Sequence, residues 1–316
     1  MSLSLVSFTY PDKPKQVNVG AWLDGGILDL TSLARAGDSP ICDNCEMTVI
    51  EWLNCTKALE WAAGLVAGAA PEEYTRSRSE VKLLAPIPNP PKIICLATNY
   101  ESHLNESRNA QSDKPKRPTP EGPRIFMKPS GNTVCADGDP ILITSHSTFC
   151  DYEGELAVIM GSACKNVSAA NAMRFVGGYA CCNDISERDL TIVERAETQE
   201  WDKFFDWLNG KWFDNSLPIG PGIVPARFVS DPHALTLRTR VNAELRQETS
   251  TGEMFFDIPH TIEYLSKIMT LQPGDIIATG TPAGVGRVMD KALQPGDVVE
   301  VEISEIGTLS NPVVEE

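Results

Sequence analysis

Two glutamates separated by a single residue form the first candidate site in this sequence of 316 residues. Glu153 and Glu155 precede an apolar run at 156–160, which predicts a strand. Alternate residues of a strand point to the same face, so the two carboxylates are expected side by side. Neighbouring carboxylates repel unless a proton or a cation lies between them, and hard divalent cations prefer oxygen ligands. The pair therefore indicates a metal site; the alternative is an edge strand with a solvated acidic face.

A third carboxylate follows a second strand signal. The apolar segment 176–182 runs directly into Asn183 and Asp184. Functional side chains are often carried at the ends of strands, where a rigid scaffold positions them. Asp184 is therefore a candidate third ligand, with a turn-forming aspartate as the alternative.

A histidine and a glutamate three residues apart form the second candidate site. The segment 99–106 could form a short helix in which His103 and Glu106 are neighbours. A carboxylate beside an imidazole orients the ring and raises its basicity, as a general base that activates water requires. The alternative is a surface pair. His146, His233 and His260 lack such an arrangement, and we expect them to be structural.

A glycine-rich segment and two lysines could bind an anionic substrate. In 279–286 (TGTPAGVG), the glycines permit close approach of the backbone, and hydroxyls and free amides can hold a carboxylate. The segment lacks the Gly-Lys-Ser/Thr ending of a phosphate-binding loop. Lys128 and Lys211 lie in short apolar or turn settings. Each could neutralise a carboxylate, although such lysines are more often at the surface.

These residues must be positioned by two different regions of the chain. Residues 3–33 contain short strand signals separated by turns, and 46–68 has apolar residues at helical spacing with Gly68 near its end. Four prolines within 83–92 favour extended chain over a helix or a central strand. We therefore predict a small N-terminal accessory domain over 1–85 and a catalytic domain over 86–316.

The larger region is dominated by strand signals. Strands are predicted in six segments, at 141–144, 155–161, 176–184, 235–244, 275–280 and 298–303. Helices are predicted at 168–175 and 257–268, and the polar, proline-rich segment 101–122 is expected to be a loop or lid. The sequence Leu-Gln-Pro-Gly-Asp occurs at 271–275 and again at 293–297, each time before an apolar strand. We interpret the two copies as paired entries into one sheet system.

Composition excludes several classes of function. The chain has 43 Asp and Glu against 27 Lys and Arg, for a net charge of −16, which repels nucleic acids and anionic membranes. It has neither an apolar run long enough to span a membrane nor the pattern of a secretory signal. The nine cysteines are an odd number and favour reduced thiols, and Cys42 and Cys45 lack the further ligands of a zinc site. We therefore expect a cytoplasmic protein with no nucleic-acid or membrane partner.

Taken together and in this order, the motifs resemble the fumarylacetoacetate hydrolase superfamily. The resemblance covers residues 85–312 and rests on NYESHLNE, FMKPS, YEGELAVIMG, VGGYACCNDISERD, GKWFD and LQPGDIIATGTPAGVG. It implies an α+β, mostly β fold, a mixed β-sandwich roll, here with a small N-terminal α+β domain. It further implies a homodimer that acts on small 2-oxo acids or 1,3-dicarbonyl compounds with Mg²⁺ or Mn²⁺, or in some members Ca²⁺.

The resemblance also implies roles for individual residues. Metal ligands would be Glu153, Glu155 and Asp184. The catalytic residues would be His103, Glu106 and Lys211. Substrate-binding positions would be Tyr100, Lys128, Arg188, Gly280 and Thr281. Arg188 and Asp189 would also form a supporting pair near the metal.

Two departures from the family pattern concern the substrate. Trp212 stands where the family motif GKSFD has serine, and Thr191 stands where RDLQ has glutamine. Both changes leave the identity of the substrate open. Aromatic residues just before Lys211 are candidates for the wall of a distal pocket, with core packing as the alternative. They are Trp201, Phe204, Phe205 and Trp207.

The favoured hypothesis is hydrolysis of a C–C bond in an acylpyruvate or fumarylpyruvate type of 2-oxo acid through a metal-stabilised enolate. His103, oriented by Glu106, would deprotonate the attacking water, while Lys128 and Lys211 hold negative charge. Decarboxylation of oxaloacetate, or keto–enol tautomerisation or isomerisation, at the same site is the alternative. A catalytically silent metal-binding protein is a third interpretation, which the complete set of candidate residues disfavours.

Overall fold

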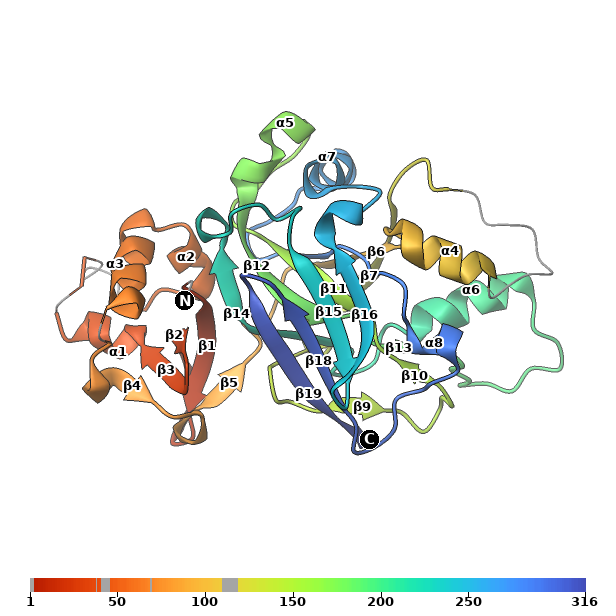
Figure 1. Cartoon of the computed structure of the whole chain (residues 1–316), viewed down its shortest axis with the longest axis horizontal. Helices are drawn as coiled ribbons and strands as arrows, with labels where there is room; N and C mark the ends of the chain where they lie inside the picture. The colour runs from red at the N-terminus through yellow and green to blue at the C-terminus, as the bar shows by residue number, and fades with distance from the viewer. Residues whose placement is uncertain (1–2, 38, 41–45, 69, 110–118) are drawn as a thin grey trace.

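The computed structural model of the chain describes residues 3–316 except for 38, 41–45, 69 and 110–118, and Figure 1 shows the arrangement of its elements. Cys42 and Cys45, interpreted above as incidental thiols, lie outside the described residues. Among the residues that are described, no helix is both long and apolar enough to cross a membrane.

The N-terminal unit is a small antiparallel sheet covered by helices. Its elements are β1 (Leu5–Tyr10), β2 (Lys13–Leu23), β3 (Gly26–Asp29), α1 (Leu30–Arg35), α2 (Val49–Leu53), α3 (Thr56–Ala67), β4 (Thr75–Arg76) and β5 (Lys82–Leu84). The helical pattern over 46–68 forms two helices rather than one. Thr48 and Glu51 form a capping box that begins α2, and α2 ends at Asn54, whose side chain donates to the Gly161 carbonyl oxygen at 2.7 Å. This contact with a distant part of the chain sets the position of the break between α2 and α3.

Within the described residues, a twelve-stranded sheet joins the N-terminal strands to those that carry the candidate site. Its order is β4-β3-β2-β1-β14-β12-β11-β17-β6-β7, with β5 beside β1 and β8 beside β14. The additional strands are β6 (Ile93–Ala97), β7 (Arg124–Lys128), β8 (Val134–Cys135), β11 (Gly154–Met160), β12 (Val176–Asn183), β14 (Leu217–Pro225) and β17 (Ile276–Ala278). Pairing is mixed, because β17 runs parallel to β6 whereas β11 runs antiparallel to both β12 and β17.

A five-stranded sheet packs against the centre of the larger one. Its order is β16-β15-β18-β19-β9, and its strands are β9 (Ile141–Ile143), β15 (Thr236–Val241), β16 (Glu244–Ser250), β18 (Val298–Ile303) and β19 (Gly307–Glu315). A further short pair consists of β10 (Cys150–Asp151) and β13 (Ser186–Glu187). The two Leu-Gln-Pro-Gly-Asp copies precede β17 and β18, which lie in different sheets. The interpretation as entries into one sheet was therefore wrong, because a turn sequence fixes the start of a strand but not its partner.

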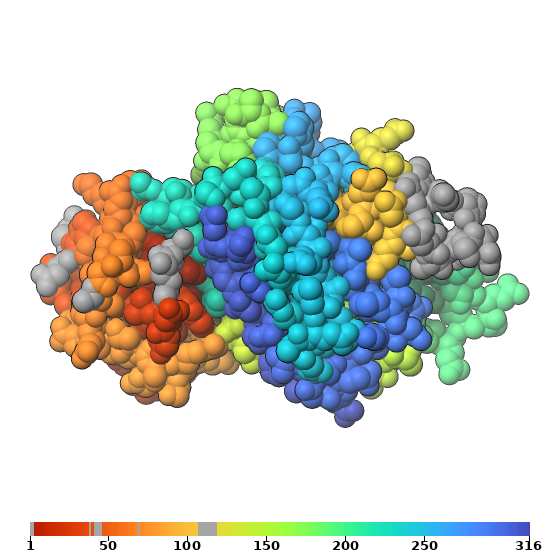
Figure 2. All heavy atoms as spheres, viewed as in Figure 1, coloured from red at the N-terminus to blue at the C-terminus, as the bar shows by residue number. Residues whose placement is uncertain are grey.

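Short helices lie around the sheets. They are α4 (Glu101–Asn109), α5 (Ala169–Ala172), α6 (Glu200–Asn209), α7 (Ile258–Ile268) and α8 (Gly286–Met289). The helix predicted over 257–268 is α7, which begins after Asp257, whose side chain accepts from the His260 amide. The helix predicted over 168–175 is α5 followed by a 3₁₀ turn. Helices α4, α6 and α8 gather at the end of the molecule opposite the N-terminal unit, as Figures 1 and 2 show.

Alternation along β11 determines which residues face the candidate site. Leu156 and Val158 belong to the hydrophobic cluster between the two sheets. Ala157 and Ile159 belong to a second cluster on the other face. Because side chains alternate along a strand, Glu155 shares the face of Ala157 and Ile159, away from the five-stranded sheet. The pleat of one strand thus separates the carboxylates from the inter-sheet core.

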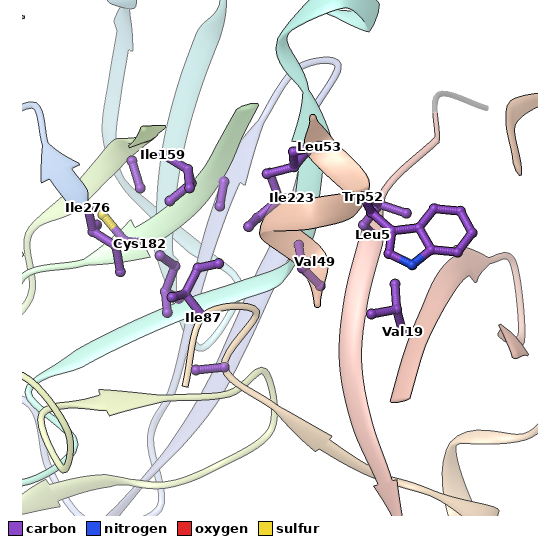
Figure 3. Close-up of a cluster of buried hydrophobic side chains, with 14 of the residues drawn as sticks. Leu5, Val19, Val49, Trp52, Leu53, Ile87, Ile159, Cys182, Ile223 and Ile276 are labelled. Carbon is purple, nitrogen blue, oxygen red and sulfur yellow. The ribbon is translucent and has the colours of Figure 1, made fainter. Parts of the chain in front are cut away.

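The second cluster continues from the sheet into the N-terminal unit. Figure 3 shows Trp52 and Val49 of α2 lying along β1 and β14, near Leu5 and Ile223, in the same cluster as Ile159 of β11. The overall class is α+β with more strand than helix, as the resemblance implied. The boundary between residues 85 and 86 stays a prediction.

Gly154 lies between the two glutamates and faces the five-stranded sheet, so a side chain there should destabilise the protein. A Cβ at this position would lie 2.1 Å from Thr239 Oγ1 and 3.3 Å from Val301 Cγ1. We expect Gly154→Ala to lower the free energy of unfolding by about 1–3 kcal/mol, as overpacked cores do. Denaturant unfolding monitored by circular dichroism would measure the change.

Gly64 provides the control, since a Cβ there would have no heavy atom within 4 Å and the residue is exposed within α3. Gly64→Ala should raise the free energy of unfolding by about 0.5–1 kcal/mol through helix propensity. A Gly154→Ala variant as stable as wild type would contradict the packing described for β11.

Candidate metal centre and active site

Three buried carboxylates converge at the junction of β11 and β12. One carboxylate oxygen from each of Glu153, Glu155 and Asp184 lies within 4.8 Å of the others. The register of β11 against β12 explains why the three carboxylates lie close together. Glu155 pairs with Cys182, and the Asp184 amide donates to the Glu153 carbonyl oxygen at 2.9 Å. The pleat and the antiparallel pairing therefore bring together the three residues that the sequence suggested.

Glu155 carries the electrostatic cost of this arrangement. Burial and the nearby carboxylates of Asp184 and Glu153 raise its pKa well above the usual value. Its Oε2 atom accepts a hydrogen bond from the Gly280 amide at 2.7 Å, a neutral donor that only partly offsets the repulsion. Glu155 is thus the member of the three that most needs a cation.

Two buried lysines already neutralise the other two carboxylates. Lys211 Nζ lies 2.6 Å from Asp184 Oδ2 and 3.0 Å from Glu153 Oε2. Lys128 Nζ lies 2.6 Å from Asp184 Oδ1 and also donates to the Ile185 carbonyl oxygen. Burial alone would lower the pKa of Lys211, but Asp184 and Glu153 outweigh it and raise that pKa. Lys211 therefore stays charged in the interior.

The turn after α6 explains how Lys211 reaches this depth. Gly210 ends the helix, and a Cβ there would lie 2.2 Å from the Glu187 carbonyl oxygen. The Gly210 carbonyl oxygen accepts from the Glu187 amide at 2.8 Å, so the backbones of α6 and β13 lie in contact. Glycine at this position lets the next residue extend its side chain to the carboxylates.

Arg188 links the carboxylates to a fourth acid that sequence reasoning missed. Its Nη2 lies 2.5 Å from Glu153 Oε1, and its Nε lies 2.9 Å from Asp151 Oδ2. Burial raises the pKa of Glu153, but Lys211 and Arg188 outweigh burial and hold it well below its usual value. The Asp151 carboxylate also accepts from the Gly286 amide at 2.7 Å. Asp151 therefore ties Arg188 to the glycine-rich turn.

The glycine-rich turn also docks the helix that carries the His–Glu pair. Glu106 Oε1 accepts from the Gly284 amide at 2.9 Å, and Ser102 Oγ accepts from the Ala283 amide at 3.3 Å. The other oxygen of Glu106 faces His103 Nδ1 at 3.4 Å, as the spacing predicted. Because Nδ1 faces Glu106, Nε2 is the ring nitrogen available to a ligand.

One cavity of about 980 Å³ connects these groups. Its lining includes His103, Glu153, Arg188, Lys211 and Thr281. The lining also includes two of the four aromatic residues proposed for a distal wall, Phe204 and Trp207. Acid–base, carboxylate and cationic groups therefore share a single space.

Of the remaining candidate residues, Thr281 lines this cavity, whereas Tyr100 and Trp212 do not. Thr281 Oγ1 donates to the Gly154 carbonyl oxygen at 3.0 Å and accepts from Gln247 at 2.8 Å, which fixes the turn beside β11. Tyr100 is fully buried and is not among the lining residues, so its role in substrate binding stays a prediction. Trp212 points outward, and its indole Nε1 donates to the Met127 carbonyl oxygen at 2.8 Å. The tryptophan that replaces serine in the motif thus does not form the cavity wall.

The donor set fits a hard divalent cation. All three candidate ligands offer carboxylate oxygens. Glu155, which has no lysine or arginine partner among the described residues, is the ligand whose pKa is raised. Divalent cations such as Mg²⁺ and Mn²⁺ take ligands of this kind. Glu153, Glu155 and Asp184 are therefore the residues that would hold the metal.

A buried carboxylate, a buried lysine and a histidine line one cavity, an arrangement typical of an enzyme active site. The family model described as Fumarylacetoacetate (FAA) hydrolase C-terminal matches residues 92–314. The chain therefore belongs to the fumarylacetoacetate hydrolase family, as the sequence motifs implied.

Similar proteins with curated names include oxaloacetate tautomerases. The mitochondrial oxaloacetate tautomerase fahd2 of Xenopus laevis is 37% identical over 99% of this chain and 91% of its own length. Oxaloacetate tautomerase YisK of Bacillus subtilis is 44% identical over 76% of this chain and 75% of its own length.

Similar solved structures include a hydrolase. Maleylpyruvate hydrolase from Sphingobium sp. SYK-6 is 29% identical, with a TM-score of 0.72 and full coverage of both chains. Another structure of that protein is described as a complex with manganese(II) and pyruvate. It is also 29% identical, with a TM-score of 0.70, and the match covers 100% of this chain and 99% of that chain.

Metal binding should depend on Glu155 without a loss of fold. Because glutamine carries no charge but keeps an oxygen for the Gly280 amide, metal-free Glu155→Gln should be at least as stable as wild type. Mn²⁺ at a hundred times its dissociation constant should stabilise wild type by about 2.7 kcal/mol and the variant by far less. Thermal unfolding with and without Mn²⁺ measures both effects.

Asp290 lines the same cavity outside the three-carboxylate cluster, so Asp290→Asn is the matched control and should keep the stabilisation by Mn²⁺. Equal stabilisation of wild type and Glu155→Gln would show that the metal binds elsewhere.

Proposed function

We propose that this protein is a divalent-metal-dependent enzyme that interconverts the keto and enol forms of a 2-oxo acid of the oxaloacetate type. The observation that carries the proposal is that one cavity is lined both by His103, whose ring faces Glu106, and by Glu153, one of the three clustered carboxylates. Support also comes from a relative named oxaloacetate tautomerase that aligns with 99% of this chain. The hydrolase favoured from the sequence becomes the second candidate.

Tautomerisation needs a group that moves a proton between carbon and oxygen. In the proposed reaction, His103 Nε2 removes a proton from C3 of the keto acid and delivers it to the oxygen on C2, which leaves the imidazole neutral again. Glu106, at 3.4 Å from Nδ1, orients the ring and stabilises it when it is protonated. The hydrogen bond from the Gly284 amide holds Glu106 in place for this role.

The cationic side chains would bind and orient the acid. Lys211 and Arg188 line the cavity beside Glu153 and present positive charge to the substrate carboxylate or to charge that develops on oxygen. When bound, the divalent cation would supply Lewis-acid stabilisation of negative charge at the 2-oxo oxygen. Mg²⁺ and Mn²⁺ are the proposed ions, with Ca²⁺ as a further option.

Hydrolysis of an acylpyruvate is the second candidate function, and the volume of the cavity supports it. A space of about 980 Å³ with Phe204 and Trp207 on its wall is large for a four-carbon acid. Maleylpyruvate hydrolase also shares the fold over the full chain. In this reaction His103 would take a proton from water instead of from carbon.

Assembly and location are extensions of the same proposal. We propose a homodimer with a small-molecule substrate and no nucleic-acid or membrane partner, consistent with the net charge of −16. A cytoplasmic location stays a prediction, because it rests on the sequence alone and one relative is named mitochondrial.

The proposed function is tested by adding the enol form of oxaloacetate to protein loaded with Mg²⁺ or Mn²⁺. We expect the ultraviolet absorbance of the enol to decay to its equilibrium value faster than with metal ion alone, without release of CO₂. Acetylpyruvate and fumarylpyruvate in parallel assays report hydrolysis. If only the acylpyruvates are converted, the hydrolase is correct and the tautomerase is not; if none of the three reacts, the silent metal-binding interpretation holds.

Removal of the proposed base should slow the reaction and leave metal binding intact. We expect His103→Gln to lower kcat by 10²–10⁴-fold, the usual contribution of a positioned acid–base group, with an unchanged Mn²⁺-induced shift in thermal stability. His146→Gln is the control, because His146 is exposed and is not among the cavity-lining residues. A His103→Gln variant with the wild-type rate would remove His103 from the mechanism.

A further inference from the structure

The outer part of the cavity carries a cation that the proposed reaction does not use. Arg124, the first residue of β7, is exposed and lines the cavity. No sequence motif selects Arg124, because a single arginine beside a proline-rich segment is typical of a surface. Its place in the sheet indicates a role.

The pleat of β7 places Arg124 in line with residues of the metal centre. Arg124, Phe126 and Lys128 are alternate residues of one strand and share a face. Phe126 lines the cavity, and Lys128 contacts the carboxylate of Asp184. At about 3.3 Å per residue, the Cα atoms of Arg124 and Lys128 are separated by about 13 Å. Lys128 thus marks the inner end of the site, and Arg124 marks its outer end.

The strand beside Arg124 leaves space for a ligand. Ala97 of β6 is its register partner, and both residues line the cavity. An alanine side chain ends at Cβ, so the arginine is not covered from its neighbouring strand. A guanidinium with open space beside it can approach a carboxylate through two parallel hydrogen bonds.

Arg124 also differs from the other cations of the cavity. Arg188 and Lys211 contact the buried carboxylates, and Arg287 lies 2.7 Å from Asp189. Among the described residues, Arg124 has no carboxylate partner. It is therefore the lining cation whose charge no described carboxylate offsets.

We propose that Arg124 binds the far carboxylate of an extended dicarboxylic 2-oxo acid, whose 2-oxo acid head lies at the metal centre. This inference rests on the proposed function, since it assumes that the head of the substrate binds beside the three carboxylates. It makes Arg124 a specificity-determining residue, and it extends the substrates of the site to acids longer than oxaloacetate.

Binding of two 2-oxo acids of equal length, each already at its keto–enol equilibrium, tests the inference without net turnover. 2-Oxoadipate carries a carboxylate at its far end, and 2-oxohexanoate carries a methyl group there. Titration calorimetry of the Mn²⁺-loaded protein should show about tenfold tighter binding of 2-oxoadipate. Arg124→Gln should abolish this preference and leave the affinity for 2-oxohexanoate unchanged within about twofold, and Arg124→Lys should retain part of it.

Arg174→Gln is the matched control, because it removes the same charge from an exposed position that is not among the lining residues. It should keep the preference. Equal affinities of wild type for the two acids would overturn the inference, as would an equal loss of affinity for both acids in Arg124→Gln.

The outcome separates this inference from the proposed function. A preference that depends on Arg124, in a protein that fails to tautomerise oxaloacetate, would support the anion subsite and contradict the tautomerase. Tautomerisation of oxaloacetate without any preference between the two acids would support the tautomerase and contradict the anion subsite.

Discussion

The rest of the site depends on one electrostatic constraint, which is that three carboxylates lie within 4.8 Å of one another in the interior. A buried charge is costly unless it is paired, and buried like charges add repulsion to that cost. Lys128, Lys211 and Arg188 offset the charges of Asp184 and Glu153. Among the described residues, Glu155 has only a backbone amide as its hydrogen-bond partner, and burial together with the neighbouring carboxylates raises its pKa. A proton or a further cation at Glu155 would relieve this repulsion, and the all-oxygen donor set favours a divalent metal ion.

The same constraint explains why the protein can be strongly acidic and still suit an anionic substrate. The net charge of −16 belongs to the whole surface, whereas a ligand in the cavity experiences the groups that line it. Arg188, Lys211 and the proposed metal ion face the head of the ligand, and Arg124 faces its far end. The glycine-rich turn holds these parts together, because its amides donate to Glu155, Asp151 and Glu106. One turn therefore positions a proposed metal ligand, an arginine and the proposed catalytic pair.

Local periodicity accounts for the parts of the site that the sequence predicted. Glu153 and Glu155 share a face because strands repeat every two residues, and His103 meets Glu106 because helices bring residues three apart together. The same rules do not say which strands pair, so the two Leu-Gln-Pro-Gly-Asp strands were assigned to one sheet. Contacts between distant segments were also beyond prediction, including the ion pair of Asp151 with Arg188, the break between α2 and α3, and the outward position of Trp212. Arg124 gave no local signal, because only its register with Ala97 places it on the cavity.

The central claim is that the metal centre and His103 act together on the C3 protons of a 2-oxo acid, a step common to the candidate reactions that pass through an enol. Exchange of the methyl protons of pyruvate in D₂O, followed by proton NMR with Mg²⁺-loaded protein, measures that step directly. The account predicts that the methyl signal decays much faster than with Mg²⁺ alone, and that Glu155→Gln returns the rate to that background. Exchange at the background rate with wild-type protein would contradict the account.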